Sequence, residues 1–572
     1  MHHVTSADTE EEEKPVPPAL AILANQRESN QGSGILKLFR HRFQPAQRQS
    51  EALFCSPFHS TPPIAVELLG FLSSSSHILY SAHAIMLSRS TFSRNAPRAV
   101  QKQCSAAGIN SRRSMASAAT PGLQYDVTEA AGVKLANREV AGPTATLALV
   151  AKAGPRYQPF PGFSDALEQF AFKSTLKRSA LRINREVELL GGEVSSTHSR
   201  ENVVLKAKFL SNDLPYFAEL LAEVASQSKF AAHELNEVVI KHLKLRQQAL
   251  AANPEQQAVD AAHSLAFHRG LGESITPSTT TPIEKYLSAE ALAEFAQQAY
   301  AKSNIALVGS GSNSAELSKW VGQFFKELPS SGSSSQYQLR PGATSKYHGG
   351  EQRVSSKAGN AVVIAFPGSA AFGTSGYKPE ASVLAALLGG ESTIKWTPGF
   401  SLLAQATQGF SQVRASTKSH TYSDAGLFTI SLSGKADHVA SASKNAVDAL
   451  KKVAAGEVAS EDIKKAIALA KFRALESAQS LETGLEATGS ALLSGGKPYQ
   501  IGEIAQSIDA VTEAQVTDVS TSYLFCVGIF ENRKIADSIS QAAKNFLSDK
   551  ASVASVGDLF QLPYGEDLGL TV

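Results

Sequence analysis

Apolar residues along this chain recur in two patterns, and the same order of patterns occurs twice between residues 144 and 557. Short runs of β-branched and apolar residues, typical of buried strands, alternate with stretches that carry apolar residues at i, i+3 and i+4, which indicate helices. The expected strands are 144–150, 203–209 and 305–309 in the first half, and 361–366, 427–432 and 553–557 in the second. This order predicts a duplicated unit built from both strands and helices.

Each half also predicts a long helix and a closing helix. Residues 230–240 correspond to residues 458–467, and both begin with Glu in the first turn, where it suits the helix dipole. From the start of the closing helix to the start of the last strand is 18 positions in the first half (287 to 305) and 42 in the second (511 to 553). The surplus, about two dozen residues, lies at roughly 520–541. We favour a retained intron in the gene model, and a genuine surface insertion is the alternative.

Composition describes an ordinary globular protein with a linker in its middle. The chain has 572 residues, of which 43% are hydrophobic and 19% charged, and residues 328–350, rich in Ser, Gly and Pro at their start, form the expected linker. A net charge of +2 without a basic cluster among aromatics argues against a nucleic-acid partner. Cys55, Cys104 and Cys526 lack metal spacing and are expected as free thiols. No apolar run is long enough to span a bilayer, so membership of a membrane complex would require protein contacts.

The amino-terminal region predicts a targeting segment behind an unexpected extension. Residues 86–125 carry six basic residues and no Asp or Glu, which is the composition of a mitochondrial transit peptide. We assign residues 86–115 to it, with Arg112-Arg113 as a processing point; a disordered basic tail is the alternative. Residues 1–85 contain the acidic run 10–13, which would hinder import, so we expect them to be a disordered over-extension of the gene model that precedes the initiator Met86.

The first candidate for chemistry is Asp165-x-x-Glu168-Gln169. In H-x-x-E-H, two imidazoles one helical turn apart hold zinc, and the Glu between them takes a proton from the metal-bound water. Here Asp and Gln stand in place of the histidines, and the amide of Gln169 is a poor ligand. Taken alone, the segment also fits an ordinary amphipathic helix with four apolar residues inward, namely Ala166, Leu167, Phe170 and Phe172.

The flanking residues resemble the mitochondrial processing peptidases and their relatives, the pitrilysin-type inverzincins. Residues 162–175 are similar to G-x-A-H-F-L-E-H-M-x-F-K-G-T, and residues 190–201 to L-G-G-x-x-N-A-x-T-S-R-E, with Ser195 and Ser196 at the N-A positions. The resemblance places the third zinc ligand, a Glu in the family, at Arg246, where a cation opposes a dication. It therefore implies a degenerate metallopeptidase with no metal, cofactor or catalytic residue, whose former motif positions are Asp165, Glu168, Gln169 and Arg246.

The same resemblance implies the fold. We expect an α+β protein of two homologous α/β domains, residues 116–327 and 351–572, each a mixed sheet with helices packed on one face, which together enclose a cleft. In the second half, residues 422–428 resemble the family's Y-x-D-x-G-L-F strand. Residues 389–403 and 562–570 resemble the G-G-x-S-x-I-K-W-x-x-G-x-S-x-L pattern and the carboxyl end of fungal core proteins of ubiquinol–cytochrome c oxidoreductase, respiratory complex III.

Three functions compete on this basis. The resemblance favours a non-catalytic core subunit of complex III that is peripheral to the matrix side of the mitochondrial inner membrane, with core protein 1 and the other subunits as partners. An active zinc endopeptidase is opposed by the lost ligands. The non-catalytic, substrate-binding subunit of the processing peptidase is opposed by the glycine-poor loop at 389–400. The cleft could also hold the clipped presequence of another subunit.

The other polar motifs give weaker evidence for a functional site. The remaining histidines considered show no i, i+4 pairing around a carboxylate, so we expect no metal site among His198, His233, His242, His263 and His268. Residues 309–313, Gly-Ser-Gly-Ser-Asn, lack the Lys of a P-loop and are expected to form a strand-to-helix turn.

Overall fold

The computed structural model describes residues 124–330, 337–342, 344–390, 399, 401–410, 412–479, 483–512, 515–516, 519 and 550–572. Several sequence predictions fall outside these residues and stay predictions. They are the extension at 1–85, the transit peptide at 86–115, the atypical segment at about 520–541, the three cysteines, and most of the pattern at 389–403.

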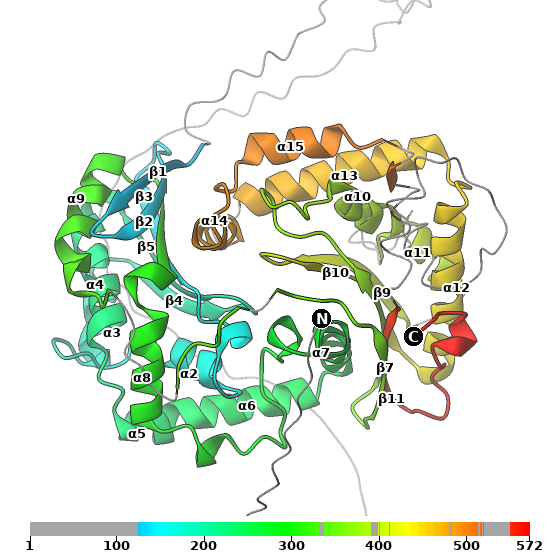
Figure 1. Ribbon diagram of the computed structural model, residues 1–572, viewed down its shortest axis with the longest axis horizontal. Coiled ribbons are helices and arrows are strands. Elements are labelled where there is room, and N and C mark those ends of the chain that lie inside the picture. The colour runs from blue at the N-terminus through cyan, green and yellow to red at the C-terminus, as the bar shows by residue number, and fades with distance from the viewer. Residues whose placement is uncertain are drawn as a thin grey trace, which may run out of the picture. The chain divides into compact units, whose positions relative to one another are not determined.

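The first half of the described chain forms a six-stranded mixed sheet, shown at the blue to green end of Figure 1. Its order is β1-β2-β6-β3-β5-β4, in which β2 and β6 run parallel and the other neighbours antiparallel. On β3, Leu147 and Leu149 face one core while Ala148 and Val150 face another, so both faces of the sheet are buried. The strands are β1 (Asp126–Ala130), β2 (Val133–Arg138), β3 (Thr144–Ala151), β4 (Glu193–His198), β5 (Val203–Leu210) and β6 (Ile305–Ser310).

The second half repeats this topology with five strands. The order is β7-β11-β8-β10-β9, and β7 and β11 are again the parallel pair. Every strand of the first sheet except β1 therefore has a counterpart in the described part of the second sheet. The predicted duplication and the α+β fold class are confirmed. The strands are β7 (Gly350–Ser355), β8 (Asn360–Pro367), β9 (Arg414–Thr421), β10 (Gly426–Gly434) and β11 (Ser552–Gly557).

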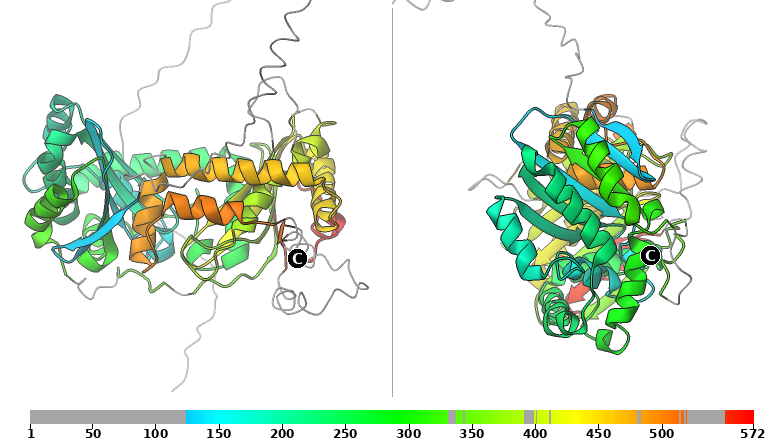
Figure 2. Two further views of the ribbon diagram at one scale, coloured as in Figure 1. Left: turned by 90° about the horizontal axis from the view of Figure 1, so that it is seen from above. Right: turned by 90° about the vertical axis from the view of Figure 1, so that its left-hand side faces the viewer.

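Helices of each half pack on one face of its own sheet and form the two largest apolar cores. A short π-helical turn, Leu235–Val239, joins α5 to α6. In the second half, α15 runs alongside α13, as Figures 1 and 2 both show. The first half contains α2 (Phe163–Phe170), α3 (Ala180–Leu189), α4 (Leu214–Gln227), α5 (Ala232–Glu234), α6 (Ile240–Ala251), α7 (Pro254–Phe267), α8 (Ala289–Ala299) and α9 (Ser314–Phe324). The second contains α10 (Pro379–Leu388), α11 (Leu402–Thr407), α12 (Ala436–Ala454), α13 (Ser460–Gln479), α14 (Thr483–Leu493) and α15 (Ile501–Asp509).

The second face of each sheet is covered by a helix from the opposite half, which the sequence patterns did not predict. Helix α7, from the first half, places a stripe of alanines against β8 and β11, and α14, from the second half, packs on β2, β3 and β6. On α14, a Cβ added at Gly489 would lie 2.4 Å from Cγ2 of Val150, so this helix touches the sheet where it has no side chain. Apolar surface exchanged in this way ties the two halves to each other.

Four of the strands missing from the sequence prediction are polar. The strands β1, β4, β7 and β9 lie at sheet edges, and none of them carries a continuous apolar run. Periodicity detects a strand by its buried side, so edge strands of this kind escape it. In the described part of the chain, no helix combines the length and the apolar character that crossing a bilayer requires.

Candidate functional site

A turn with two glycines directs the strand that borders the site. After α3, Gly191 adopts a positive φ of 66°, which glycine tolerates without a steric penalty. A Cβ at Gly192 would lie 2.3 Å from the Phe217 ring, so only glycine fits there. The chain then enters β4, at the free edge of the sheet, where the Ser196 hydroxyl donates a hydrogen bond of 2.9 Å to the Glu168 carbonyl. The Leu-Gly-Gly segment thus fixes β4 against α2.

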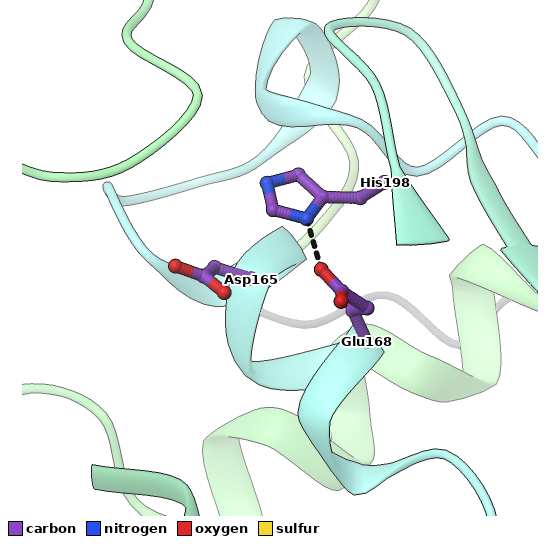
Figure 3. A group of neighbouring side chains, drawn as sticks. All are labelled: Asp165, Glu168 and His198. Atoms are coloured by element: carbon purple, nitrogen blue, oxygen red, sulfur yellow. Dashed lines mark hydrogen bonds and ion pairs between the residues drawn. The ribbon is translucent and has the colours of Figure 1, made fainter. Parts of the chain in front are cut away.

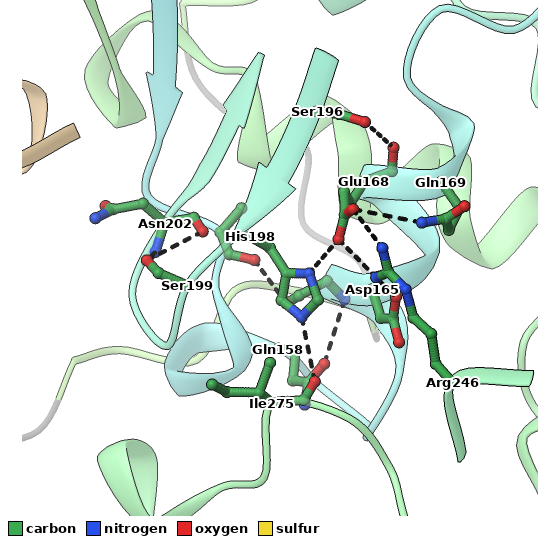
Figure 4. A network of polar contacts seen from close by, with 12 residues as sticks. Gln158, Asp165, Glu168, Gln169, Ser196, His198, Ser199, Asn202, Arg246 and Ile275 are labelled. Atoms are coloured by element: carbon green, nitrogen blue, oxygen red, sulfur yellow. Dashed lines mark hydrogen bonds and ion pairs between the residues drawn. The ribbon is translucent and has the colours of Figure 1, made fainter. Parts of the chain in front are cut away.

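All four degenerate motif positions meet in one network, shown in Figure 4. Helix α2 supplies Asp165 and Glu168, which are 0% and 4% exposed, and α6 supplies Arg246. Nη1 of Arg246 lies 2.5 Å from Oδ1 of Asp165 and 2.8 Å from Oε2 of Glu168, and Nη2 lies 2.7 Å from Oε1 of Glu168. Gln169 is half-buried, and its amide nitrogen lies 3.4 Å from Oε1 of Glu168. The residue expected to oppose a metal is therefore bonded to the two carboxylates.

A fourth member, His198, was not identified as part of this site from the sequence. It ends β4, and Figure 3 shows its ring facing Glu168. Nδ1 is hydrogen-bonded to Oε2 of Glu168, and Nε2 lies 3.2 Å from the carbonyl oxygen of Ile275. Since both partners are acceptors, both ring nitrogens donate, which requires the charged imidazolium. One feature of the sequence could have indicated His198. The family segment that resembles residues 190–201 has Thr at this position, so His198 departs from the family pattern.

Electrostatic interactions in the network favour the charged forms of Glu168 and His198. Burial alone would raise the pKa of Glu168, but hydrogen bonds and charges from Arg246 and His198 lower it to about 2. Burial alone would lower the pKa of His198, yet the hydrogen bond to Glu168 and the charges of both carboxylates raise it above its usual value. Burial raises the pKa of Asp165, and the neighbouring cations only partly oppose this. Oδ2 of Asp165 has no hydrogen-bond partner within the described chain.

The donor set does not suit zinc in this arrangement. One ligand atom each from Asp165, Glu168 and His198 lies within 4.8 Å of the others, which is compact enough for an ion. Zinc, however, needs a neutral imidazole nitrogen, and both nitrogens of His198 are engaged as donors. The Arg246 guanidinium also contacts both carboxylates and would repel a dication. Chemically, the group is two cations paired with two acids.

A cavity of about 340 Å³ borders this network. Its wall includes His198, Arg246, Leu250, Ile275 and Thr276. The edge strand β4 contributes Thr197 and His198 to the same wall. The cavity therefore adjoins a strand edge whose outer side is unpaired in the described sheet.

A second buried network connects the halves. Arg156, 6% exposed, donates from Nη1 to Glu201 at 2.7 Å, and its two terminal nitrogens pair with Asp424 at 2.8 and 2.7 Å. The Ser423 hydroxyl donates to Glu201 at 2.6 Å, and the Ser345 backbone N–H donates to Asp424 at 2.8 Å. The Arg156 hydrogen bond lowers the pKa of Asp424 despite its burial. Asp424, the Asp of the Y-x-D-x-G-L-F segment, therefore connects the two halves through its ion pair with Arg156.

A pair of histidines, His263 buried and His420 half-buried, lies between α7 and β9. His263 accepts a hydrogen bond of 2.8 Å from the Tyr422 hydroxyl and donates one of 2.7 Å to the Val259 carbonyl. Its ring centroid is 5.2 Å from that of His420, whose Nε2 has no hydrogen-bond partner within the described chain. Burial, with the charges of Arg200 and Lys418, lowers the pKa of His420 to about 4. Burial lowers the pKa of His263 as well, so both rings are neutral at physiological pH.

Comparison with known proteins gives a consistent result. Residues 135–278 match the insulinase family, peptidase family M16, and residues 286–469 match the inactive domain of that family. Mitochondrial cytochrome b-c1 complex subunit 2 from Neurospora crassa is 47% identical over 487 residues, which is 85% of this chain and 100% of the relative. The Yarrowia lipolytica subunit is 35% identical, covering 78% of this chain and 96% of its own. The human subunit is 28% identical over 76% and 90% of the two chains.

Proposed function

The chain belongs to peptidase family M16, and from its similarity to the fungal relatives we propose that it is core protein 2 of mitochondrial ubiquinol–cytochrome c oxidoreductase, a structural subunit without catalysis. It is not a peptidase, and its role is to support the assembly and stability of a respiratory electron-transfer complex. The structural observation that supports the absence of catalysis is the pairing of Arg246 with Glu168 and Asp165.

The Arg246 pairing removes the chemistry that hydrolysis needs. A peptidase of this family uses zinc to lower the pKa of a water and a carboxylate to take its proton. Here the corresponding carboxylate, Glu168, has a pKa of about 2 and is held by two cations. A general base works best with a pKa near the operating pH. Glu168 is therefore a structural anion between α2, β4 and α6.

What remains of the site holds secondary structure together. Arg246 ties α6 to α2, and His198 ties β4 to the same helix and to the segment around Ile275. Arg156 does the same between the two halves through Glu201 and Asp424. Buried ion pairs contribute little net stability but cost several kcal/mol when one partner is lost, on the order of 3–5 kcal/mol. Such pairs fix one arrangement, which a scaffold subunit requires.

The partners follow from the assignment. We propose that core protein 1 pairs with this chain, that other subunits of the complex contact it, and that it is peripheral to the inner membrane on the matrix side. The absence of a membrane-spanning helix among the described residues is compatible with attachment through protein contacts. The basic, acid-free residues 86–115 would supply the mitochondrial address.

A bound presequence is a finer part of the same proposal. The cavity beside Glu168 and His198 adjoins the unpaired edge of β4, and an extended peptide can add to such an edge through main-chain hydrogen bonds. Peptide recovered from the purified complex and identified by mass spectrometry tests this separately. A cavity without peptide would leave the core-subunit assignment intact and remove this addition.

Mass spectrometry of mitochondrial membrane complexes, separated on a native gel, tests the assignment. We expect the chain in a band that contains haem and the other cytochrome b-c1 subunits. Recovery in a soluble heterodimer that cleaves presequence peptides would favour the processing-peptidase alternative and contradict the proposal. Peptides that map to residues 1–85 or 520–541 would at the same time show whether those segments exist in the natural protein.

A further inference from the structure

The carboxyl-terminal segment presents one aromatic side chain entirely to solvent. Phe560 lies in the loop that follows β11, and its exposed fraction is 102%. Its neighbour Tyr564 is 55% exposed, whereas Leu562, between them, is 3% exposed and belongs to the core of the second half. Exposing a whole Phe side chain to water is unfavourable relative to burying it. This loop is therefore a candidate surface for contact with another protein.

The loop is held rigidly from below. Arg353, on β7, donates to three of its carbonyls, those of Leu559 at 2.6 Å, Leu562 at 3.0 Å and Pro563 at 2.8 Å. The same guanidinium carbon lies 3.8 Å from the centroid of the Tyr564 ring. These contacts fix both the backbone and one of the two aromatic rings.

Further hydrogen bonds complete the turn that carries Phe560. The Asp558 carboxylate accepts from the Phe560 backbone N–H at 3.1 Å, and the Asp558 backbone N–H donates to Asn360 at 2.8 Å. The Tyr564 backbone N–H donates to Asp567 at 3.0 Å. A side chain displayed on a backbone already ordered loses little further entropy on binding, so its burial contributes more fully to affinity.

The charges around the two rings are acidic. Asp558, Glu566 and Asp567 lie within the same short segment, and Glu566 and Asp567 are exposed. The nearby cation, Arg353, is largely buried beneath the loop and occupied by its carbonyls. An aromatic centre with an acidic border complements an apolar pocket bordered by Lys or Arg. It does not complement a membrane that carries anionic lipids, which acidic side chains avoid.

We propose that the segment 558–567, here called the aromatic knob, inserts Phe560 into an apolar pocket with a basic rim on another subunit of the same complex. This inference rests on the proposed function, because it requires the chain to be part of a multisubunit assembly. Aromatic side chains that enter a pocket at the centre of a contact carry much of its binding energy. Phe560 enters the pocket. Arg353 holds the loop backbone and the Tyr564 ring in place. The acidic residues favour a partner with basic residues around the pocket.

Site-specific photocrosslinking tests the proposal. Benzoylphenylalanine is placed at position 560 of the full chain, and at position 189 as a control, because Leu189 is 85% exposed on α3 at a distant place in the sequence. Membranes are irradiated and the complexes separated on a native gel. We expect an adduct from position 560 to one other subunit, mapped to apolar residues next to Lys or Arg. Adducts to lipid, to this chain itself, or to no partner within the assembled complex would overturn it.

The experiment distinguishes failure of the proposed function from failure of the contact proposed for Phe560. If the chain is absent from every haem-containing band, the proposed function fails. If it is present and position 560 gives no partner adduct, the aromatic knob alone fails. Phe560→Ser should weaken retention of the chain in the solubilised complex by roughly tenfold or more, with an unchanged melting temperature. Leu189→Ser should leave retention unchanged, and equal loss in both variants would contradict a specific anchor.

Discussion

Arg246 and Glu168 form a two-pronged ion pair, with nitrogen to oxygen distances of 2.7 and 2.8 Å, at the positions where the resemblance to zinc peptidases places the metal. The two residues come from α6 and α2, so their pairing is a tertiary contact. From the sequence, Arg246 only indicated that a metal ligand was missing. In the structure, its guanidinium takes the place of a metal cation, because its nitrogens donate hydrogen bonds to both carboxylates.

Arg246→Gln should lower stability and make the protein more sensitive to acid. Arg246 is partly exposed, with 37% of its side chain accessible, so we expect about 2 kcal/mol, less than for a fully buried pair. Glu168 has its pKa lowered in the folded state, so its stabilisation is complete above the unfolded value of about 4.3 and is lost as pH falls toward about 2. Without Arg246 this loss should begin at higher pH. Urea titrations between pH 7 and 3 measure it, and parallel curves for both proteins would contradict the pairing.

Arg156→Gln should destabilise the connection between the halves. It removes the only described cation that bridges Glu201 and Asp424, and it leaves two mostly buried carboxylates without their partner. We expect a loss of about 3–5 kcal/mol in the free energy of unfolding. Lys465→Gln, which breaks an exposed pair with Asp462 on α13, is the control and should show no measurable change. Equal effects of the two substitutions would show that Arg156 has no special role.

Gly489→Ala should disturb the seating of α14 on the first sheet. The added Cβ would lie 2.4 Å from Cγ2 of Val150, and overpacking of this kind costs about 1–3 kcal/mol. Adding Val150→Ala should restore part of the loss by making room. Gly502→Ala on α15 is a matched control, because nothing lies within 4 Å of its added Cβ and alanine favours the helix. Thermal melts of the four proteins decide this, and a neutral Gly489→Ala would refute the close approach.

His420→Gln should flatten the dependence of stability on pH between 6.5 and 4. The unfolded chain binds a proton on this residue below about 6.5, whereas the folded protein does so only below about 4. The unfolded state therefore holds more protons in this window, and stability falls as pH falls. The wild-type loss from this residue is on the order of 3 kcal/mol across the window. Denaturant titrations compare it with His242→Gln, an exposed control on α6 that should keep the wild-type slope.

The sequence was informative for the central strands that carry a continuous apolar run, whereas β2, which is largely buried but includes Lys134 and Asn137, was missed. The run at 361–366 became β8, whose residues there are all buried, and the run at 203–209 became β5, which begins with three buried apolar residues and then alternates with Lys206 and Lys208. The edge strand β4 could not be predicted in this way, since its residues are polar and only its pairing with β5 makes it a strand. The cross-packing of α7 and α14 was also hidden. An apolar helix face does not say which sheet it will cover.

The site likewise contains residues that the sequence identified and one residue that it did not. Asp165, Glu168 and Arg246 were found through a motif and an alignment, and the structure brings them together. His198 was set aside as a scattered histidine, because its partner Glu168 lies thirty positions away and only the turn at Gly191 brings β4 to α2. A one-dimensional spacing rule detects ligands on one helix. It does not detect a strand that meets the helix in space.

The metal content of the natural protein tests the central claim most directly. The chain is purified from mitochondria within its complex, separated from the other subunits under native conditions, and assayed for zinc by mass spectrometry together with proteolysis of a presequence peptide. The pairing of Arg246 with Asp165 and Glu168 predicts zinc far below one ion per chain and no proteolysis that a chelator removes. One zinc per chain, with cleavage abolished by chelation, would contradict the account.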